Sequence, residues 1–169
     1  LLSSFILVSR MRLRTFVGLF RLQSVFLGLY ALILAYLIGE FDLVVMAGLI
    51  LVLKAGLLPY ALLETAKRSD ATPKLEAYFR PTTNSFIAAF TILFSFLVTM
   101  RVFPFLGAEI FIVGTAVSLL LLGFSLLIVR GDLFGQSIGF LVMENGIFIF
   151  GLALVGGMPL FIDIGIFFD

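Results

Sequence analysis

Long apolar runs are the feature of this chain that most restricts its fold. Runs of about 20 residues follow one another along the sequence, separated by short breaks that contain charged residues, Gly or Pro. A helix of this length crosses the ~30 Å hydrocarbon core of a bilayer, where backbone groups must be hydrogen-bonded within their own segment. The runs also lack the alternation of barrel strands. They therefore predict an all-α, polytopic transmembrane helical bundle.

About seven spans are expected, of which the first and the last are incomplete. The tail of one helix occupies residues 1–8, and the start of another follows from residue 158. Between them, complete spans are predicted at residues 16–38, 43–64, 84–105, 107–129 and 135–156.

The spans are expected to form two parts. Residues 1–83 hold the N-terminal membrane helices and a basic loop, and residues 84–169 hold the C-terminal helices. The chain starts at Leu1 and stops at Asp169, both inside apolar runs. We therefore expect it to belong to a longer protein, with residues missing at both ends.

Composition supports a membrane protein and excludes several kinds of chemistry. Hydrophobic residues make up 62% of the chain and charged residues 12%, and the mean hydropathy is +1.26; soluble domains are about half apolar and a quarter charged. The sequence has no His and no Cys, which excludes imidazole or thiolate ligation of zinc, haem or an iron–sulfur cluster. It also shows no nucleotide, metal or nucleophile motif. We expect no catalytic residue, metal or cofactor in this chain, so any redox chemistry belongs to partners.

Basic residues are distributed unevenly between the breaks. Only Arg101 is expected on one side of the membrane, and Lys54 lies within a span. The positive-inside rule therefore predicts that the loop at 65–83 is cytoplasmic, with Glu40 and Glu109 on the outer side. A basic loop can also bind nucleic acid, but beside a bilayer it is expected to set orientation and contact lipid. The other basic residues, all on the predicted cytoplasmic side, are Arg10, Arg12, Arg14, Arg21, Lys67, Arg68, Lys74, Arg80 and Arg130.

Function is expected to involve the ionisable residues inside the spans. A charge at the bilayer centre costs on the order of 2.5–3.5 kcal/mol on insertion scales, so it needs a partner or a water-filled path. At ~1.5 Å rise per residue, three side chains lie roughly 14–18 Å from the start of their helices, close to the midplane; they are Lys54, Glu144 and Asp169. Asp163 lies nearer the outer face. Basic and acidic groups at one depth are what a lateral proton path would use, so these four are the predicted proton-relay residues.

Lys54 has a functional and a structural interpretation. Its side chain is too short to reach the interface from a midplane ~15 Å deep, so a buried acidic or hydroxyl partner, or water, is expected. Pro59 follows within the same span and has no N–H, which leaves the carbonyl of Ala55 without its helical donor. That carbonyl could hold a water beside the ammonium group. A kink with no further role is the alternative.

Glu144 lies in a run that contains other polar side chains. One helix face carries Ser137, Leu141, Glu144 and Phe148, and Asn145 comes next in the chain. Burial favours the neutral carboxyl and a nearby ammonium favours the carboxylate, so a group between these influences can bind and release a proton near neutral pH. Ser137 and Asn145 are its predicted supporting polar residues. A structural Glu that is hydrogen-bonded to a neighbouring helix is the alternative.

The C-terminal stretch resembles a known family. Gln136 to Asp169, QSIGFLVMENGIFIFGLALVGGMPLFIDIGIFFD, looks like the C-terminal half of the hydrogenase-4 component E family, membrane subunits of group 4 nickel–iron hydrogenase and formate hydrogenlyase complexes. The segments GFLVMENG and GMPL are its specific part. The segment from Phe41 to Pro59 is similar to the Lys-bearing helix of that family, and with the Arg-rich turn before Leu22-Gln23-Ser24 the resemblance covers nearly the whole chain.

The last three helices of that family resemble the small K subunit of respiratory complex I and the C subunit of multisubunit cation/proton antiporters. The resemblance implies such a three-helix unit at residues 107–169. In the complex I relative, membrane-embedded glutamates on the second and third helices belong to the proton path. By motif, Glu144 takes the first position and Asp169 the second, with Asp163 competing for the second role.

The resemblance also implies partners and a place in the cell. It implies antiporter-like and other membrane-arm subunits as neighbours, and peripheral hydrogenase subunits that hold nickel–iron and iron–sulfur centres. The chain would be a non-catalytic subunit of an oxidoreductase complex in the bacterial or archaeal inner membrane, contributing to proton translocation and to assembly of the membrane arm. Two alternatives stay open: the equivalent subunit of a complex I-like or cation/proton antiporter complex, or a stand-alone small transporter, which should show internal repeats and its own substrate cavity. The coupling ion, H⁺ or Na⁺, also stays open.

Overall fold

The computed structural model describes residues 13–68, 81–104 and 107–156 of the chain. Within these ranges the protein is almost entirely helical, which confirms the all-α prediction there. Its elements are α2 (Leu13–Ile38), α3 (Phe41–Leu49), the π-helix η1 (Ile50–Leu57), α4 (Leu58–Arg68), α5 (Pro81–Val102), the short 3₁₀ helix η2 (Gly107–Glu109), α6 (Ile110–Val129) and α7 (Leu133–Gly156).

Five helices are long and apolar enough to cross a membrane, and they correspond to the five complete spans expected from the sequence. Three elements, α3, η1 and α4, continue into one another as the single span Phe41–Arg68. This span ends later than predicted because the helix continues into its basic end, where Glu64 lies 3.7 Å from Lys67 and 3.3 Å from Arg68. The helices expected at 1–8 and from 158 lie outside the described residues, so the total of about seven spans is not confirmed.

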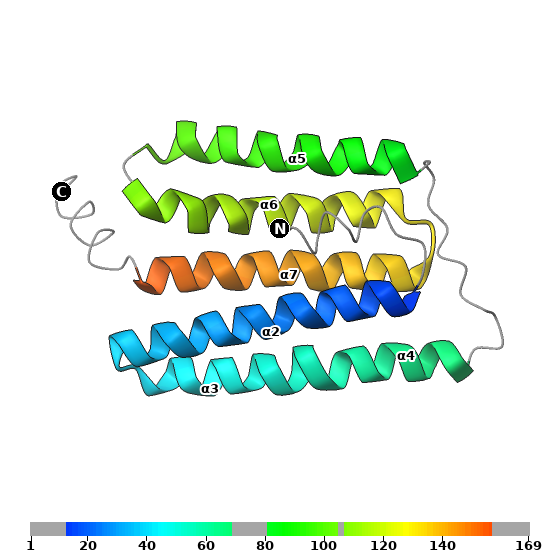
Figure 1. The fold of residues 1–169 in the computed structure, drawn as a ribbon, viewed down its shortest axis with the longest axis horizontal. Helices are drawn as coiled ribbons and strands as arrows, with labels where there is room; N and C mark the ends of the chain where they lie inside the picture. The colour runs from blue at the N-terminus through cyan, green and yellow to red at the C-terminus, as the bar shows by residue number, and fades with distance from the viewer. Residues whose placement is uncertain (1–12, 69–80, 105–106, 157–169) are drawn as a thin grey trace.

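The five spans lie side by side in the order α5, α6, α7, α2 and α3–α4 (Figure 1). Helix α6 packs against α7 and α5, and α2 contacts α7 as well as α3, η1 and α4. Connections alternate between the two ends of the bundle: α2 turns into α3 at one end, and α6 turns into α7 at the other, beside the start of α2. The orientation prediction depends on this up-and-down threading; which end is cytoplasmic stays a prediction.

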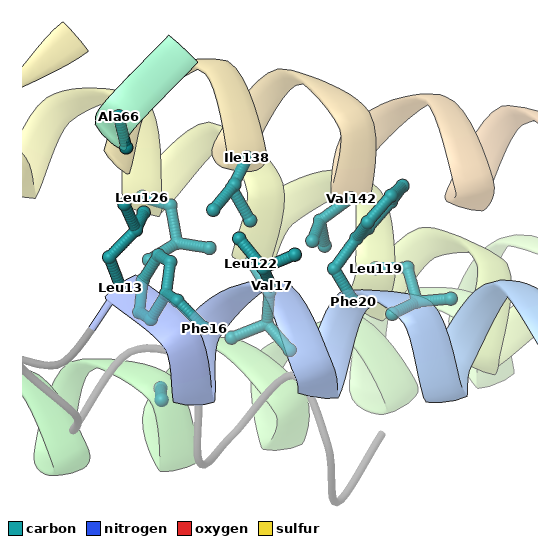
Figure 2. Close-up of a cluster of buried hydrophobic side chains, with 11 residues drawn as sticks. Leu13, Phe16, Val17, Phe20, Ala66, Leu119, Leu122, Leu126, Ile138 and Val142 are labelled. Carbon is teal, nitrogen blue, oxygen red and sulfur yellow. The ribbon is translucent and has the colours of Figure 1, made fainter. Parts of the chain in front are cut away.

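Side chains of α2 form the main apolar cluster with α6 and α7. Phe16 and Phe20 of α2 are fully buried at the junction of the three helices (Figure 2). In lipid, helices associate through such packing and not through exclusion of water from apolar surface. The cluster fixes α2 on α6 and α7. The other members that Figure 2 labels are Leu13, Val17, Ala66, Leu119, Leu122, Leu126, Ile138 and Val142.

Glycines bring α6 and α7 into backbone contact. A Cβ atom on Gly123 would lie 2.5 Å from the backbone nitrogen of Met143, and one on Gly146 would lie 2.7 Å from that of Leu120. Such distances leave no room for a side chain, so the small residues allow the close approach that is common between membrane helices. The segment of α7 around residue 144 is therefore held firmly against α6.

Candidate functional site

An ion pair joins two spans near the middle of the bundle. Lys54 Nζ in η1 lies 3.1 Å from Glu144 Oε1 in α7. The Lys54 side chain is 7% exposed and the Glu144 side chain 35% exposed, so the ammonium group is the more deeply buried partner. The expectation that Lys54 has an acidic partner is confirmed, although this partner is only partly buried.

Two further groups surround the ammonium of Lys54. It donates a hydrogen bond to Asn145 Oδ1 at 3.2 Å, and it lies 4.2 Å from the centre of the Phe148 ring. Asn145 Nδ2 in turn donates to Ser24 Oγ of α2 at 3.5 Å. Asn145 and Ser24 are both fully buried. A continuous polar connection therefore runs from Glu144 through Lys54 and Asn145 to Ser24.

The local backbone explains how Lys54 is presented. The π-helix η1 ends where the Leu58 N–H bonds to the carbonyl of Leu53, and the next residue is the buried Pro59. A chain returning from i−5 to i−4 bonding skips one carbonyl, and a proline removes a second donor. The freed carbonyl that Pro59 predicts beside Lys54 stays a prediction. Pro59 can be seen in the sequence, whereas the π-helix cannot. Such segments are frequent at functional sites.

Close packing of α2 on η1 brings Ser24 into this connection. A Cβ atom on Gly28 would lie 2.6 Å from side-chain atoms of Leu51, so any larger residue would require the Leu51 side chain to move. Ser24 lies one helical turn before Gly28 on the same face of α2. Sequence reasoning did not assign Ser24 to the site; the available signal was a polar residue in the middle of an apolar span.

Every described span has a buried polar side chain near its middle. Lys54 lies midway between Phe41 and Arg68, the two ends of its span. Thr91 and Ser118 donate to backbone carbonyls of their own helices at 2.7 Å, whereas the groups on α2, η1 and α7 are joined side chain to side chain. The five residues are Ser24, Lys54, Thr91, Ser118 and Asn145.

A groove opens beside the ion pair, between α7 and the span formed by α3, η1 and α4. It encloses about 290 Å³, and its walls are apolar except at Lys54 and Glu144. Glu144, the more exposed partner, is one of the residues that line the groove. Its apolar lining residues are Met46, Leu49, Ile50, Leu53, Leu58 and Phe148.

A second hollow lies between α2, α6 and α7. It encloses about 430 Å³, and its polar lining groups are Gln23, Tyr30 and Thr115. Gln23 is the chain neighbour of Ser24, where the polar connection from Glu144 reaches α2. The connection thus begins at one hollow and ends next to the other.

The remaining predicted site residues are placed differently. Ser137 is exposed, and its hydroxyl donates to the carbonyl of Leu133 at 2.8 Å, so its hydrogen atom is used within α7. Its supporting role for Glu144 stays a prediction. Asp163 and Asp169 lie outside the described residues.

Arg130, expected only to set orientation, is part of the packing at the end of the bundle. Its side chain is 1% exposed, and the guanidinium carbon lies 4.6 Å from the centre of the Phe16 ring. Gln136 Nε2 donates to the Arg130 carbonyl at 3.0 Å. Burial lowers the pKa of Arg130 from its ordinary value, and the nearby Asp132 opposes this shift. Arg130 therefore fastens the α6–α7 turn to the start of α2.

Fold and site together define a helical protein with five candidate membrane spans and a charged pair at its centre. Among the residues that the structure describes, no group of three or more His, Cys, Asp or Glu side chains could hold a metal ion. Comparison with protein-family models, with curated proteins and with solved structures finds no match for this chain.

Proposed function

We propose that this chain is a membrane-arm subunit of a group 4 nickel–iron hydrogenase-type complex, similar to formate hydrogenlyase, and that it contributes a proton-relay site built on Lys54 and Glu144. The observation that carries the proposal is the 3.1 Å ion pair at the centre of apolar helices. The hydrogenase assignment is supported by the resemblance of residues 136–169.

Stability alone is a poor reason for this pair. Desolvation of two charges can exceed their mutual attraction, and an apolar pair of similar volume is often equally stable or more stable. An intramembrane charge adds a cost of about 2.5–3.5 kcal/mol on insertion scales. A charged pair at this depth is better explained by a use for its charges than by its contribution to folding.

The proposed relay moves one proton in three balanced steps. A proton reaches the Glu144 carboxylate from the groove and neutralises it, which weakens the ion pair. The Lys54 ammonium then releases its own proton toward the Asn145 and Ser24 side, through a hydroxyl or a water. Finally the proton on Glu144 crosses the 3.1 Å to the neutral amine and restores the charged pair. One proton has then moved sideways through the bundle.

Asn145 has a positioning role in this proposal. Its carboxamide cannot carry a proton in the way that a carboxyl or an amine can. It accepts from Lys54 at 3.2 Å and donates to Ser24 at 3.5 Å, so it holds the amine toward α2. The Ser24 hydroxyl can both donate and accept, which suits it to pass a proton or to hold a water.

Redox chemistry belongs to partner subunits in this proposal. Peripheral hydrogenase subunits would hold the nickel–iron and iron–sulfur centres, and antiporter-like subunits would continue the proton path within the inner membrane. The equivalent subunit of a complex I-like or cation/proton antiporter complex is the second candidate, because residues 107–169 resemble subunits of both. A lateral relay would serve either machine.

Co-purification distinguishes the two candidates. We expect that a tagged form of the chain, extracted in mild detergent, brings down antiporter-like subunits and a peripheral hydrogenase arm containing nickel and iron. Metal analysis and peptide mass spectrometry measure this directly. Recovery of a complex I-like or antiporter assembly without nickel would contradict the hydrogenase assignment, and recovery of the chain alone would favour a stand-alone transporter.

A further inference from the structure

The second hollow, between α2, α6 and α7, is closed at one end by apolar packing. Phe20 of α2 and Leu119 of α6 are almost completely buried in the main apolar cluster, and Leu119 also lines the hollow. From there the lining follows α2 forward from Gln23 to Tyr30 and α6 backward to Phe111, about 10–12 Å along either helix. The hollow therefore extends from the middle of the bundle toward the end where α6 begins (Figure 1).

Hydrogen-bonding groups line this hollow at three points. The Gln23 amide lies at its inner end, and the hydroxyls of Tyr30 and Thr115 lie nearer the start of α6. Within the described part of the chain, the Tyr30 hydroxyl makes no hydrogen bond, which is costly where lipid chains are its only neighbours. The volume of about 430 Å³ has room for several waters. Water held at these three points joins the middle of the bundle to one end.

A carboxylate lies at the end toward which the hollow extends. Glu109 directly precedes α6, is partly exposed, and is close enough to Tyr30 to interact with it electrostatically. The other described charges at this end, Glu40, Asp42 and Arg101, are exposed. A carboxylate in this position favours hydration and attracts cations.

We propose that this hollow is a water-filled access chamber, which admits water and small cations to the middle of the bundle from the Glu109 end alone. Gln23 brings the chamber next to Ser24, where the polar connection from Glu144 reaches α2. A proton released by Lys54 toward Ser24 leaves the bundle through this water. That use rests on the proposed function, whereas the access itself needs only that the bundle lies in a membrane.

Thiol labelling in membrane vesicles tests the access directly, because the sequence has no Cys. Charged methanethiosulfonates do not cross membranes, and they react with the thiolate, which forms in water and is suppressed in apolar surroundings. Thr115→Cys places the probe in the hollow. Leu29→Cys is the matched control, since Leu29 is the chain neighbour of Tyr30, is 46% exposed and does not line the hollow. Phe41→Cys, 75% exposed at the same end as Glu109, reports which side of the vesicle that end faces.

We expect a cationic reagent to modify Thr115→Cys at least about tenfold faster than Leu29→Cys, and only from the side that labels Phe41→Cys. Phe26→Cys, which lines the hollow and is 64% exposed, should follow Thr115→Cys and shows that the result does not depend on one substitution. Equal rates at 115 and 29, or labelling from the opposite side, would overturn the proposal. A hollow that stays unlabelled while Phe41→Cys reacts would do the same, as expected if lipid chains or another part of the protein fill it.

Glu109→Gln tests the carboxylate at the end of the chamber. Its loss should slow the cationic reagent at Thr115→Cys about three- to fivefold and leave the rate of an uncharged reagent of similar size unchanged. Asp42→Asn is the control, because it removes an exposed carboxylate from the same end, and it should change the cationic rate by less than about twofold. Equal slowing by the two substitutions would overturn the assignment of Glu109 to the chamber.

Two further measurements separate this proposal from the relay. Labelling of Thr115→Cys should be unchanged when Glu144→Gln is added, because access does not depend on a titrating group. In the assembled complex, modification of the thiol at 115 should lower proton-linked turnover about tenfold or more, and modification at 29 should not. Labelling at 115 without that loss would reject the chamber as the route of the relay. Failure of labelling with intact turnover would reject the chamber and leave the relay standing.

Discussion

At the residue scale, Lys54 is constrained from several directions at once. Glu144 supplies a counter-charge, Asn145 a neutral acceptor, and Phe148 the face of an aromatic ring 4.2 Å from the ammonium. A cation over an aromatic face gains roughly 0.5–2 kcal/mol, more when it is desolvated. The ring and the amide can therefore hold Lys54 in place while the charge on Glu144 changes.

A double-mutant cycle measures how strongly the pair is coupled. We expect Lys54→Met alone to destabilise the folded bundle by about 1–3 kcal/mol, less than the ~3–5 kcal/mol of a fully buried pair, because Glu144 keeps some access to the groove. The double variant, Lys54→Met with Glu144→Leu, should return close to the original stability. Unfolding in detergent micelles reports both values. If the two single effects simply added, the 3.1 Å contact would have no energetic meaning.

How far the site could be foreseen differs from residue to residue. Lys54 and Glu144 could be identified because charges are costly in the middle of apolar spans. Their common depth made a contact possible, but the sequence could not show that these two residues meet, since they lie far apart in the chain and in different spans. The link from Asn145 to Ser24 depends on which face of α2 packs on η1 and α7, and no local pattern in the sequence specifies that.

At the scale of the elements, glycines and a proline shape the site more than helix propensity does. Gly28 lets α2 approach η1, and Pro59 follows the π-helix that presents Lys54. The positions of the spans could be predicted from hydropathy to within a few residues. The π-helix could not, because π-helices are rare and residues 50–57 have the apolar composition of an ordinary membrane helix.

Two glycine substitutions of equal size test the packing of α6 on α7. Gly123→Ala should destabilise the bundle by about 1–3 kcal/mol, because the new Cβ would lie 2.5 Å from the Met143 nitrogen and force the helices apart. Gly151→Ala is the matched control, since nothing lies within 4 Å of its Cβ position, and it should change stability by less than about 0.5 kcal/mol. Thermal unfolding in detergent compares them. Equal effects would show that the two helices are not in backbone contact.

At the scale of the whole molecule, buried polar groups share one depth across the row of spans. The linked groups on η1, α7 and α2 lie between two hollows of about 290 and 430 Å³. Hydropathy predicts where the spans lie and, because connections alternate, which span ends lie on the same side of the bundle. It does not predict that α2 lies between α7 and α3–α4, because that order depends on side-chain packing between distant segments. The lateral direction of the connection therefore becomes visible only in the fold.

Topology in the membrane is predicted from the basic residues. Accessibility tags in the loop at 65–83 should report the cytoplasm, and tags near Glu40 or Gly107 should report the opposite side. Selective labelling of intact cells and of inverted vesicles measures both. An outward-facing loop at 65–83 would reverse the direction of every span.

In the proposed function, Glu144 carries protons. Glu144→Gln keeps nearly the same volume and can still accept a hydrogen bond from Lys54, but it cannot release a proton. Glu144→Asp is the matched variant that keeps a titratable group and shortens it by about one methylene, a gap that a water can bridge. Subunit content of the purified complex must be compared first, because loss of assembly in the Gln variant would make Glu144 a structural partner.

The decisive measurement is proton-linked turnover of the intact complex in membrane vesicles, with a pH-sensitive dye on one side. With Glu144→Gln we expect full assembly and a loss of proton movement of about 10²-fold or more, as for removal of an essential acid–base group. Glu144→Asp should retain part of the activity. Proton-coupled turnover at the original level in the Gln variant would contradict the relay role of Glu144.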